Sequence, residues 1–279
     1  MTAHDPDRNR AGELRGLPLR IHEIQGGLAT KRLGSKIHYF SELTSTNAYA
    51  RRVAEQGAME GEVVIAEQQT QGRGRLGRHW VSPPNVNLYF SVVLRPTLPP
   101  ARAPLITLMA AVALADTVGS FISSPPVIKW PNDILVDGRK LAGILTESAG
   151  DSARIEFVIL GIGVNLNFPQ ELMPDAIRER ATSLMLHARK TVSREIFARR
   201  LIQDLDRCYG ILEESGFGAL APRWEARFGL RGKRVRVEIV NEVLLGKATG
   251  IDRDGALIVQ SDDGRLQRVI AGDVIAEEN

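Results

Sequence analysis

The sequence has one cysteine, few aromatic residues and no apolar run long enough to cross a bilayer. Because Cys208 is the only cysteine, a disulfide framework and a metal site built on cysteines are both excluded. A single thiol suits a reducing compartment, so we expect a cytoplasmic protein. A membrane span needs about 20 consecutive apolar residues, and no stretch approaches that length. The first fifteen residues carry charges of both signs without the apolar core of a signal peptide, so we expect neither export nor membrane insertion.

An excess of charge of one sign is also missing. Thirty-six Lys and Arg stand against 33 Asp and Glu, which leaves a formal charge of +3. This balance is compatible with anionic substrates but does not by itself indicate DNA or RNA binding. With 279 residues, 43% of them hydrophobic, the chain is long enough for one large domain and a small one.

The distribution of apolar residues predicts three parts. Residues 1–34 are polar and lack a sustained helical period, so we expect a mobile tail and a loosely structured lead-in. Residues 35–229 mix strand-like and helix-like segments, which predicts an α+β domain. Residues 230–279 contain four or five short strand-like runs separated by Asn, Gly and Asp turns, which indicates a small SH3-like barrel.

Local signals predict the elements of the middle part. Ser45 or Thr46 is suited to cap a helix that stops at Gly57. The apolar segment 103–121 predicts a buried helix with Pro104 in its first turn, and Asp137-Gly138 between β-branched runs predicts a hairpin. We expect further strands at 36–40, 62–67, 87–95 and 154–167, and helices at 193–214 and around Trp224.

The stretch GRGRLGRHW, residues 72–80, raises three alternatives. Its first six letters match a dinucleotide-binding turn, which must lead into a helix, but the nearby Ser82-Pro83-Pro84 would stop one. Arginines beside an aromatic also suit a nucleic-acid patch, although the basic residues are confined to this loop. A solvated turn whose glycines adopt positive φ is the third alternative.

Four further segments place polar side chains beside small residues: TSTN at 44–47, AEQQTQ at 66–71, KWPNDILVDGRKLAG at 129–143 and GIGVNLN at 161–167. Together with GRGRLGRHW, and in this order, they resemble the biotin protein ligases, which join biotin to a lysine of a carboxylase carrier domain. The resemblance runs from about Lys36 to the C-terminus. It implies a mixed sheet flanked by helices, as in class II aminoacyl-tRNA synthetases, followed by an SH3-like barrel.

The resemblance also implies the substrates and the site. Biotin and Mg-ATP are the implied ligands, with Mg²⁺ bound with ATP near Asp133 rather than in a protein cage, and a biotin carboxyl carrier protein or domain is the implied partner. The residues implied to bind biotin are Ser45, Thr46, Asn47, Gln69, Gly72, Arg73, Gly74, Arg75, Lys140 and Gly143. The residues implied to bind ATP are Arg75, Trp80, Asn132, Asp133, Lys140, Gly163 and Asn165. Lys140, Arg73, Arg75 and Asp133 are the implied catalytic residues.

These residue types fit those roles. The urea ring of biotin needs a mixed set of hydrogen-bond donors and acceptors, which hydroxyl and amide side chains supply. Arginine binds carboxylate and phosphate oxygens in pairs, and a glycine-rich loop is able to close over a bound ligand. Lys140, placed between the biotin carboxylate and the α-phosphate, would offset the repulsion between two anions. We also expect Asp133 to orient or deprotonate the attacking amine.

Two other functions stay open. A lipoate or octanoate ligase on a similar fold is the nearest enzymatic alternative, and a nucleic-acid-binding regulator is the second. Family members that repress transcription carry a winged helix-turn-helix domain ahead of the catalytic one, but only 44 residues precede Ser45 and no pair of amphipathic helices is found there, so we do not expect DNA binding. The segment 168–186, which should cover the adenylate, resembles the family only weakly, so we predict no site residue within it. The sequence leaves open whether two subunits pair as a homodimer.

Overall fold

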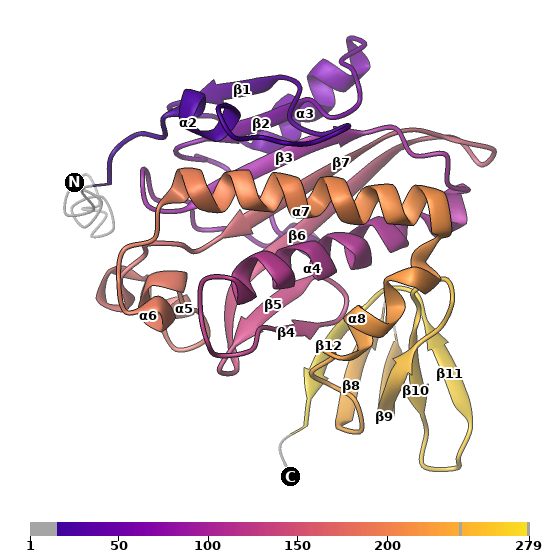
Figure 1. The fold of residues 1–279 in the computed structure, drawn as a ribbon. Coiled ribbons are helices and arrows are strands. Elements are labelled where there is room, and N and C mark those ends of the chain that lie inside the picture. Colours follow the sequence, from indigo (N-terminus) through magenta and orange to yellow (C-terminus); the bar gives the residue numbers. More distant parts are fainter. Residues whose placement is uncertain (1–15, 240–241, 278–279) are drawn as a thin grey trace, which may run out of the picture.

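The computed structural model describes residues 16–239 and 242–277 and places them in a large and a small sheet with associated helices (Figure 1). The strands of the large sheet are β1 (Ile37–Phe40), β2 (Val63–Ala66), β3 (Leu88–Leu94), β4 (Val127–Lys129), β5 (Asp133–Val136), β6 (Arg139–Gly150) and β7 (Ile155–Val164). Their order is β1-β2-β3-β7-β6-β5-β4. Only β1 and β2 pair in parallel among these neighbours. The mixed sheet confirms the predicted α+β class.

The helices fall mostly where the local signals predict them. They are α2 (Ile21–Gln25), α3 (Thr46–Glu55), α4 (Pro104–Gly119), α5 (Asp175–Arg178), α6 (Leu184–Ala188), α7 (Arg194–Ser215) and α8 (Ala221–Glu225). The Ser45 side chain caps α3 by accepting a hydrogen bond from Ala48 N, and Pro104 opens α4. Asp137 and Gly138 both have positive φ, as the hairpin turn requires.

The small sheet is antiparallel throughout and has the order β11-β10-β9-β8-β12. Its strands are β8 (Arg234–Ile239), β9 (Glu242–Ile251), β10 (Leu257–Gln260), β11 (Leu266–Val269) and β12 (Asp273–Ala276). Five short strands in this arrangement agree with the expected SH3-like barrel. The Trp130 indole, just after β4, donates a hydrogen bond to Gly255 O and so joins the two sheets.

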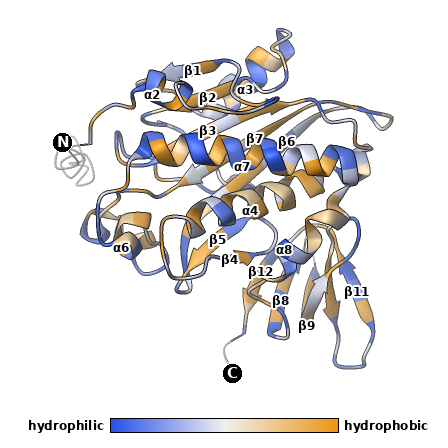
Figure 2. Ribbon diagram, viewed as in Figure 1, coloured by the Kyte–Doolittle hydropathy of each residue, from blue (hydrophilic) through white to orange (hydrophobic). Residues whose placement is uncertain are grey.

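One face of the large sheet is covered by α4 and α7, which together with the sheet form the main hydrophobic core. Twelve of the sixteen residues of α4 are buried, and Figure 2 shows this helix as largely hydrophobic. Our expectation that no stretch is long and apolar enough to cross a membrane was wrong for Pro100–Gly119, which meets that test by length and composition. Within the fold, 67% of an 18-residue window of this segment is buried. Its apolarity is explained by its place against the sheet.

The opposite face of the sheet changes character along β7, and this change makes room for the site. Phe157 and Ile159 of β7 pack with α3 in a second, smaller core. The next residues on the same face are Gly161, Gly163 and then Asn165, because strand side chains alternate with a period of two. The apolar cover therefore ends at Ile159, and the sheet beyond it is left open for polar side chains.

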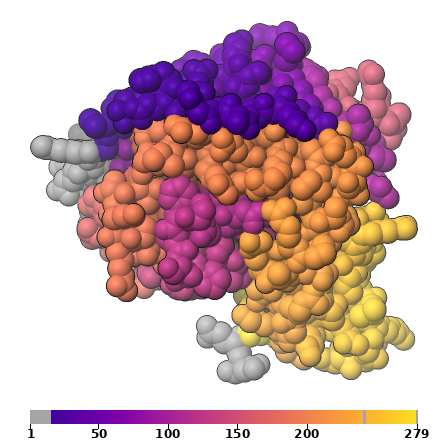
Figure 3. Space-filling view, viewed as in Figure 1, coloured from indigo at the N-terminus to yellow at the C-terminus, as the bar shows by residue number. Residues whose placement is uncertain are grey.

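The lead-in differs from our expectation of a loosely structured segment. Residues 16–34 include helix α2, which packs against α7, and they bury Leu19, Ile24 and Leu33. The Asp206 carboxylate of α7 accepts the backbone N–H groups of residues 31–33 at 2.8 to 2.9 Å. Figure 3 shows this segment lying along α7. The prediction failed because the apolar residues are few and far apart in sequence; residues 1–15 lie outside the described part.

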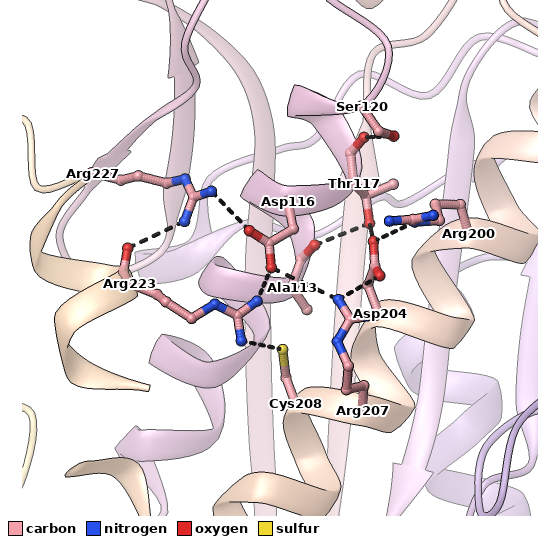
Figure 4. Close-up of polar contacts among 10 residues, drawn as sticks. All are labelled: Ala113, Asp116, Thr117, Ser120, Arg200, Asp204, Arg207, Cys208, Arg223 and Arg227. Atoms are coloured by element: carbon pink, nitrogen blue, oxygen red, sulfur yellow. Dashed lines mark hydrogen bonds and ion pairs between the residues drawn. The ribbon is translucent and has the colours of Figure 1, made fainter. Parts of the chain in front are cut away.

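Two aspartates join α4, α7 and α8 away from the open face (Figure 4). Asp204 of α7, fully buried, accepts hydrogen bonds from Thr117 at 2.9 Å and from Arg200 and Arg207 at 3.0 and 2.7 Å. Asp116 of α4 pairs with the α8-side residues Arg223 and Arg227. Cys208 lies buried beside this cluster, and burial raises the pKa of its thiol, so we expect a slow-reacting cysteine.

Candidate active site

A cleft of about 1110 Å³, including its open mouth, lies on the open face of the sheet. The predicted site residues that line it are Ser45, Thr46, Asn47, Gln69, Arg73, Gly74, Arg75, Trp80, Asn132, Asp133, Lys140, Gly143, Gly163 and Asn165. Gly72 does not line it. A Cβ at Gly72 would lie 2.4 Å from the Trp80 carbonyl oxygen, so this glycine serves the packing of the loop.

The glycines of β7 are gaps that side chains from other elements fill. A Cβ at Gly161 would lie 2.0 Å from Asn47 Oδ1, and one at Gly163 would lie 2.6 Å from the Trp80 indole. Gly161 and Asn165 are four residues apart, roughly 13 Å along a strand. The cleft therefore has two ends, which we call the α3 end (Ser45, Thr46, Asn47, Gln69) and the lysine end (Asn132, Asp133, Lys140, Asn165).

Neutral polar groups at the α3 end are joined in one network. Gln69 Oε1 accepts hydrogen bonds from Thr46 N and Oγ1 at 2.9 and 3.2 Å, and Gln69 Nε2 donates to Ser82 Oγ. Ser91 Oγ lies 2.8 Å from Thr46 Oγ1 and 2.7 Å from Asn47 Oδ1. The network holds several donors and acceptors in fixed positions, which suits a neutral ligand that has both kinds of group.

Asn47 is more committed to the protein than its predicted ligand role suggests. Its Nδ2 donates to Leu145 O and to Glu147 Oε2 at 3.3 and 2.7 Å, and its Oδ1 is close to Ser91. The side chain is buried. Asn47 therefore fixes the N-terminus of α3 over β6 and β7, beside the cleft.

Lys140 and Asp133 form an ion pair at the lysine end. Lys140 Nζ lies 2.7 Å from Asp133 Oδ1, and the two side chains are 35% and 18% exposed. The β5–β6 hairpin brings the two side chains together. Asp133 on β5 pairs with Gly143 on β6, and Lys140 lies three residues before Gly143 on the same strand. The ammonium is accessible from the cleft and has a carboxylate as its resting partner.

The Trp80 ring lies on the sheet beside Lys140. Gly143 and Gly163 face each other across β6 and β7, and the ring rests on both. Lys140 Nζ is 5.5 Å from the centre of the ring, within reach of a cation–π interaction. Gly143 is implied to bind biotin, but in this structure the space beside it is taken by Trp80 and Lys140.

The loop 72–80 is a short hairpin that reaches from the cleft to the small sheet. Gly74 N donates to Arg78 O and Trp80 N to Gly72 O, at 2.7 and 2.9 Å. Leu76 and Gly77 at its tip have positive φ. This hairpin agrees with the predicted loop between two strands, and strand β3, not a helix, follows it. The dinucleotide-binding alternative, which needs a helix there, is therefore wrong.

Two arginines of this loop are anchored by other elements. Arg75 donates to Asn132 Oδ1 at 3.1 Å and to Gly272 O at 3.4 Å, and Arg78 pairs with Asp273 of β12. Burial lowers the pKa of the Arg75 guanidinium, while Asp273 and Asp133 oppose that shift. An arginine nevertheless stays charged at any working pH. The small sheet thus holds the loop in place over the cleft.

Sequence reasoning missed several lining residues. They are Arg78, His79, Val81, Phe90, Ile144, Leu145, Gly161, Ile162, Ile177, Ala181 and Asp273. Arg78, His79 and Gly161 fall inside motifs that the sequence had singled out. Ile177 and Ala181 belong to the weakly matching segment 168–186, and Asp273 comes from the small sheet, where no sequence signal pointed to the site.

The described residues contain no cluster of three or more His, Cys, Asp or Glu side chains that could hold a metal ion. Mg²⁺ is commonly held by one or two carboxylates together with substrate phosphates. Asp133, a carboxylate directed to the lysine end of the cleft, fits a magnesium ion that arrives with a nucleotide.

The chain matches two family models. Residues 39–165 match the biotin/lipoate A/B protein ligase family, and residues 231–276 match the biotin protein ligase C-terminal domain. The first match covers the α3 end, the arginine loop and Lys140, and the second covers all five strands of the small sheet.

Named relatives agree with these matches. The chain is 39% identical to the biotin–[acetyl-CoA-carboxylase] ligase of Mycobacterium tuberculosis, over 83% of the chain and 85% of the relative. It is 34% identical to the bifunctional ligase/repressor BirA of Bacillus subtilis, over 90% of the chain and 77% of the relative. A biotin protein ligase from Aquifex aeolicus, solved in complex with biotin and ATP, shares the fold with a TM-score of 0.75 at 24% identity, over 88% of the chain and 100% of that structure. The chain belongs to the biotin protein ligase family.

Proposed function

We propose that this biotin protein ligase activates biotin with ATP to biotinyl-5′-AMP and then transfers the biotinyl group to a lysine of a biotin carboxyl carrier protein or domain. One observation carries the proposal. A single cleft joins a neutral polar network at the α3 end to the half-buried ammonium of Lys140 at the lysine end, with an arginine-rich loop across both. Such a cleft suits a ligand with a neutral polar ring and an anionic tail beside a second anion.

The α3 end binds the ring of biotin. The ring has two N–H donors and one carbonyl acceptor, and Ser45, Thr46 and Gln69 offer matching groups there. The valerate chain then runs toward Lys140 past the Asn47 and Trp80 side chains, which lie directly on Gly161 and Gly163 of β7. Trp80, which now rests on Gly163, must shift or form one wall of this path.

In the first step, a carboxylate oxygen of biotin attacks the α-phosphorus of ATP and pyrophosphate leaves. No base is needed, because the carboxylate is already ionised. Lys140 Nζ leaves Asp133 and lies between the two anions, which offsets their repulsion and the charge that develops on phosphorus. Arg73 and Arg75 contact the carboxylate and the phosphate from the loop.

Magnesium bound with the nucleotide would neutralise phosphate charge, and Asp133 is the side chain suited to hold it. The same carboxylate is the resting partner of Lys140. Moving Lys140 to the anions therefore frees Asp133 for this second role.

In the second step, the neutral amine of the carrier lysine attacks the acyl carbon of the mixed anhydride, and AMP leaves with the bonding electrons. The amine must lose a proton, and Asp133 orients the amine or accepts that proton. The loop 72–80 keeps water from the anhydride in the meantime, because Arg75 and Arg78 are tied to Asn132 and to the small sheet.

The test uses the whole chain with Mg-ATP, biotin and the biotin carboxyl carrier domain of an acetyl-CoA carboxylase. We expect biotin-dependent exchange of pyrophosphate into ATP, and addition of one biotinyl group to the carrier in the mass spectrum. Lipoate in place of biotin should support neither reaction, whereas preferred use of lipoate would favour the alternative ligase. Arg73→Ala should greatly slow exchange, and an active chain that tolerates this change would remove Arg73 from the site.

A further inference from the structure

A buried histidine outside the predicted site connects two segments around Lys140. His187 lies on α6, and its side chain is 8% exposed. Its Nδ1 is 3.2 Å from Asp137 Oδ2, in the turn between β5 and β6. Its Nε2 is 2.8 Å from Thr182 Oγ1, in the segment that borders the cleft through Ala181.

The proton on this ring is placed by its neighbours. A carboxylate only accepts hydrogen bonds, so Asp137 favours the tautomer with the proton on Nδ1. Nε2 of the neutral ring then accepts from the Thr182 hydroxyl, which is fully buried. Asp137, His187 and Thr182 thus form a line of three groups that has the order of an acid–base–hydroxyl triad, but the hydroxyl is sealed from the cleft and has no substrate to attack.

The line ends on the backbone of Lys140. Lys140 N donates to Arg180 O at 2.8 Å, and Thr182 N donates to Lys140 O at 2.9 Å. These two bonds form an isolated bridge between Lys140 and Ala181. The β5–β6 register shifts between Ile134 and Leu135, next to the residue that pairs with Lys140.

Asn165 is tied to the same point. Its Nδ2 donates to Thr182 O at 3.0 Å, and its backbone pairs with Leu141 and Leu184. Thr182 is therefore a junction: its N–H holds Lys140, its carbonyl holds Asn165, and its hydroxyl contacts His187. A displacement of Thr182 would move both groups at the lysine end.

We propose that His187 is a positioning residue for Lys140. It joins Asp137, in the hairpin turn, to Thr182, in the segment 168–186, and so fixes the bridge between Lys140 and Ala181 that holds the catalytic lysine. The inference rests on the proposed function, in which Lys140 acts between biotin and ATP. His187 does not touch the cleft and acts only through Thr182 and Asp137. The α3 end is built from α3 and β2, so biotin-ring binding should not depend on it.

The experiment measures biotin-dependent pyrophosphate exchange in the full chain carrying His187→Ala. We expect kcat to fall about tenfold and KM for ATP to rise, since a small displacement of a catalytic group is costly, while KM for biotin stays within about twofold. His187→Gln places an amide near the position of Nε2 and keeps the contact with Thr182. His187→Asn places an amide near the position of Nδ1 and keeps the contact with Asp137. Each should fall between the wild type and His187→Ala.

His38 provides a matched control. Its Nε2 is 2.7 Å from Glu62 Oε2, and its side chain is 14% exposed, but it lies on β1 away from the cleft. His38→Ala should lower stability without changing the ratio of the two KM values. If His187→Ala behaves like His38→Ala, or like the wild type, the positioning role is refuted.

Thr182→Val is nearly isosteric and tests the same link if His187→Ala folds poorly. It should show the same kinetic pattern, and the double variant should lose little more than either single one, because both changes break one chain of contacts. Additive losses would overturn the inference. A wild-type chain without exchange would instead count against the proposed function, so the two failures are distinct.

Discussion

Replacing Arg194 with methionine tests how firmly the lead-in segment is tied to the α3 end of the cleft. Arg194 Nη1 lies 2.7 Å from Glu67 Oε2 and 3.0 Å from Asn87 O, and Nη2 contacts Leu17 O. The Arg194 and Glu67 side chains are 6% and 3% exposed. Glu67 also accepts from Leu19 N and from the Tyr39 hydroxyl. The buried Arg194–Glu67 ion pair therefore connects the lead-in, the end of β2 and the start of α7.

The expected loss follows from this geometry. Methionine fills most of the space but leaves a buried carboxylate without its cation, which costs about 3 to 5 kcal/mol. For a chain of this size, each kcal/mol shifts Tm by roughly 2 to 4 °C, so we expect a fall of roughly 6 to 20 °C. Glu67 precedes Gln69 by two residues, so KM for biotin should also rise.

Two further variants separate the buried charge from simple loss of packing. Glu67→Gln combined with Arg194→Met keeps an acceptor for Leu19 and Tyr39 but removes the unpaired charge, and it should recover more than half of the lost stability in urea. Arg234→Met breaks the exposed pair with Asp262, and it should change Tm little because solvent screens such a pair. A Tm shift for Arg194→Met no larger than that of Arg234→Met would refute the reasoning.

Four other outcomes follow from the site. Lys140→Ala should slow pyrophosphate exchange at least about 100-fold, because the charge between two anions is lost; exchange near the wild-type rate would remove Lys140 from the mechanism. Arg75→Gly should release biotinyl-5′-AMP into solution, where it would label a free amine. If the variant retains biotinyl-5′-AMP as the wild type does, the loop 72–80 does not close over the cleft. Gly163→Ala should displace Trp80 and expose the loop arginines to trypsin, whereas an unchanged digestion pattern would show that the ring has room. Burial lowers the pKa of His187, so its contribution to stability is present above the ordinary pKa of about 6.5 and is lost as the pH falls below that value. His187→Gln should therefore make the free energy of unfolding in urea depend less on pH in this range. An equally steep dependence in the variant would show that His187 is not the group that titrates.

Signals that depend on adjacent residues predicted the local structure well. The Ser45 cap, the Pro104 helix start and the Asp137-Gly138 turn each follow from the conformational preference of one or two residues, and each is found in the structure. The long apolar helix at 104–119 was equally clear, because a continuous apolar segment that begins with Pro104 predicts a buried helix.

Contacts between distant segments were not predictable in the same way. The lead-in has few apolar residues, and its order comes from a carboxylate on α7, about 170 positions away in sequence. Asp273 lines the cleft because the small sheet packs beside the arginine loop. His187 is a single polar residue directly after the weakly matching segment 168–186, and only the fold places it between Asp137 and Thr182.

The glycines of the site show why its motifs mix small and polar residues. A Cβ at Gly161 would collide with Asn47, and one at Gly163 would collide with Trp80, so each glycine is explained by a side chain that arrives from a distant part of the chain. The sheet supplies a flat surface, α3 and the arginine loop supply the polar groups, and the gaps in β7 let those groups lie directly on the strands. A change that adds even one methyl group at Gly163 therefore acts on the loop that covers the cleft, rather than on the stability of the sheet that carries it.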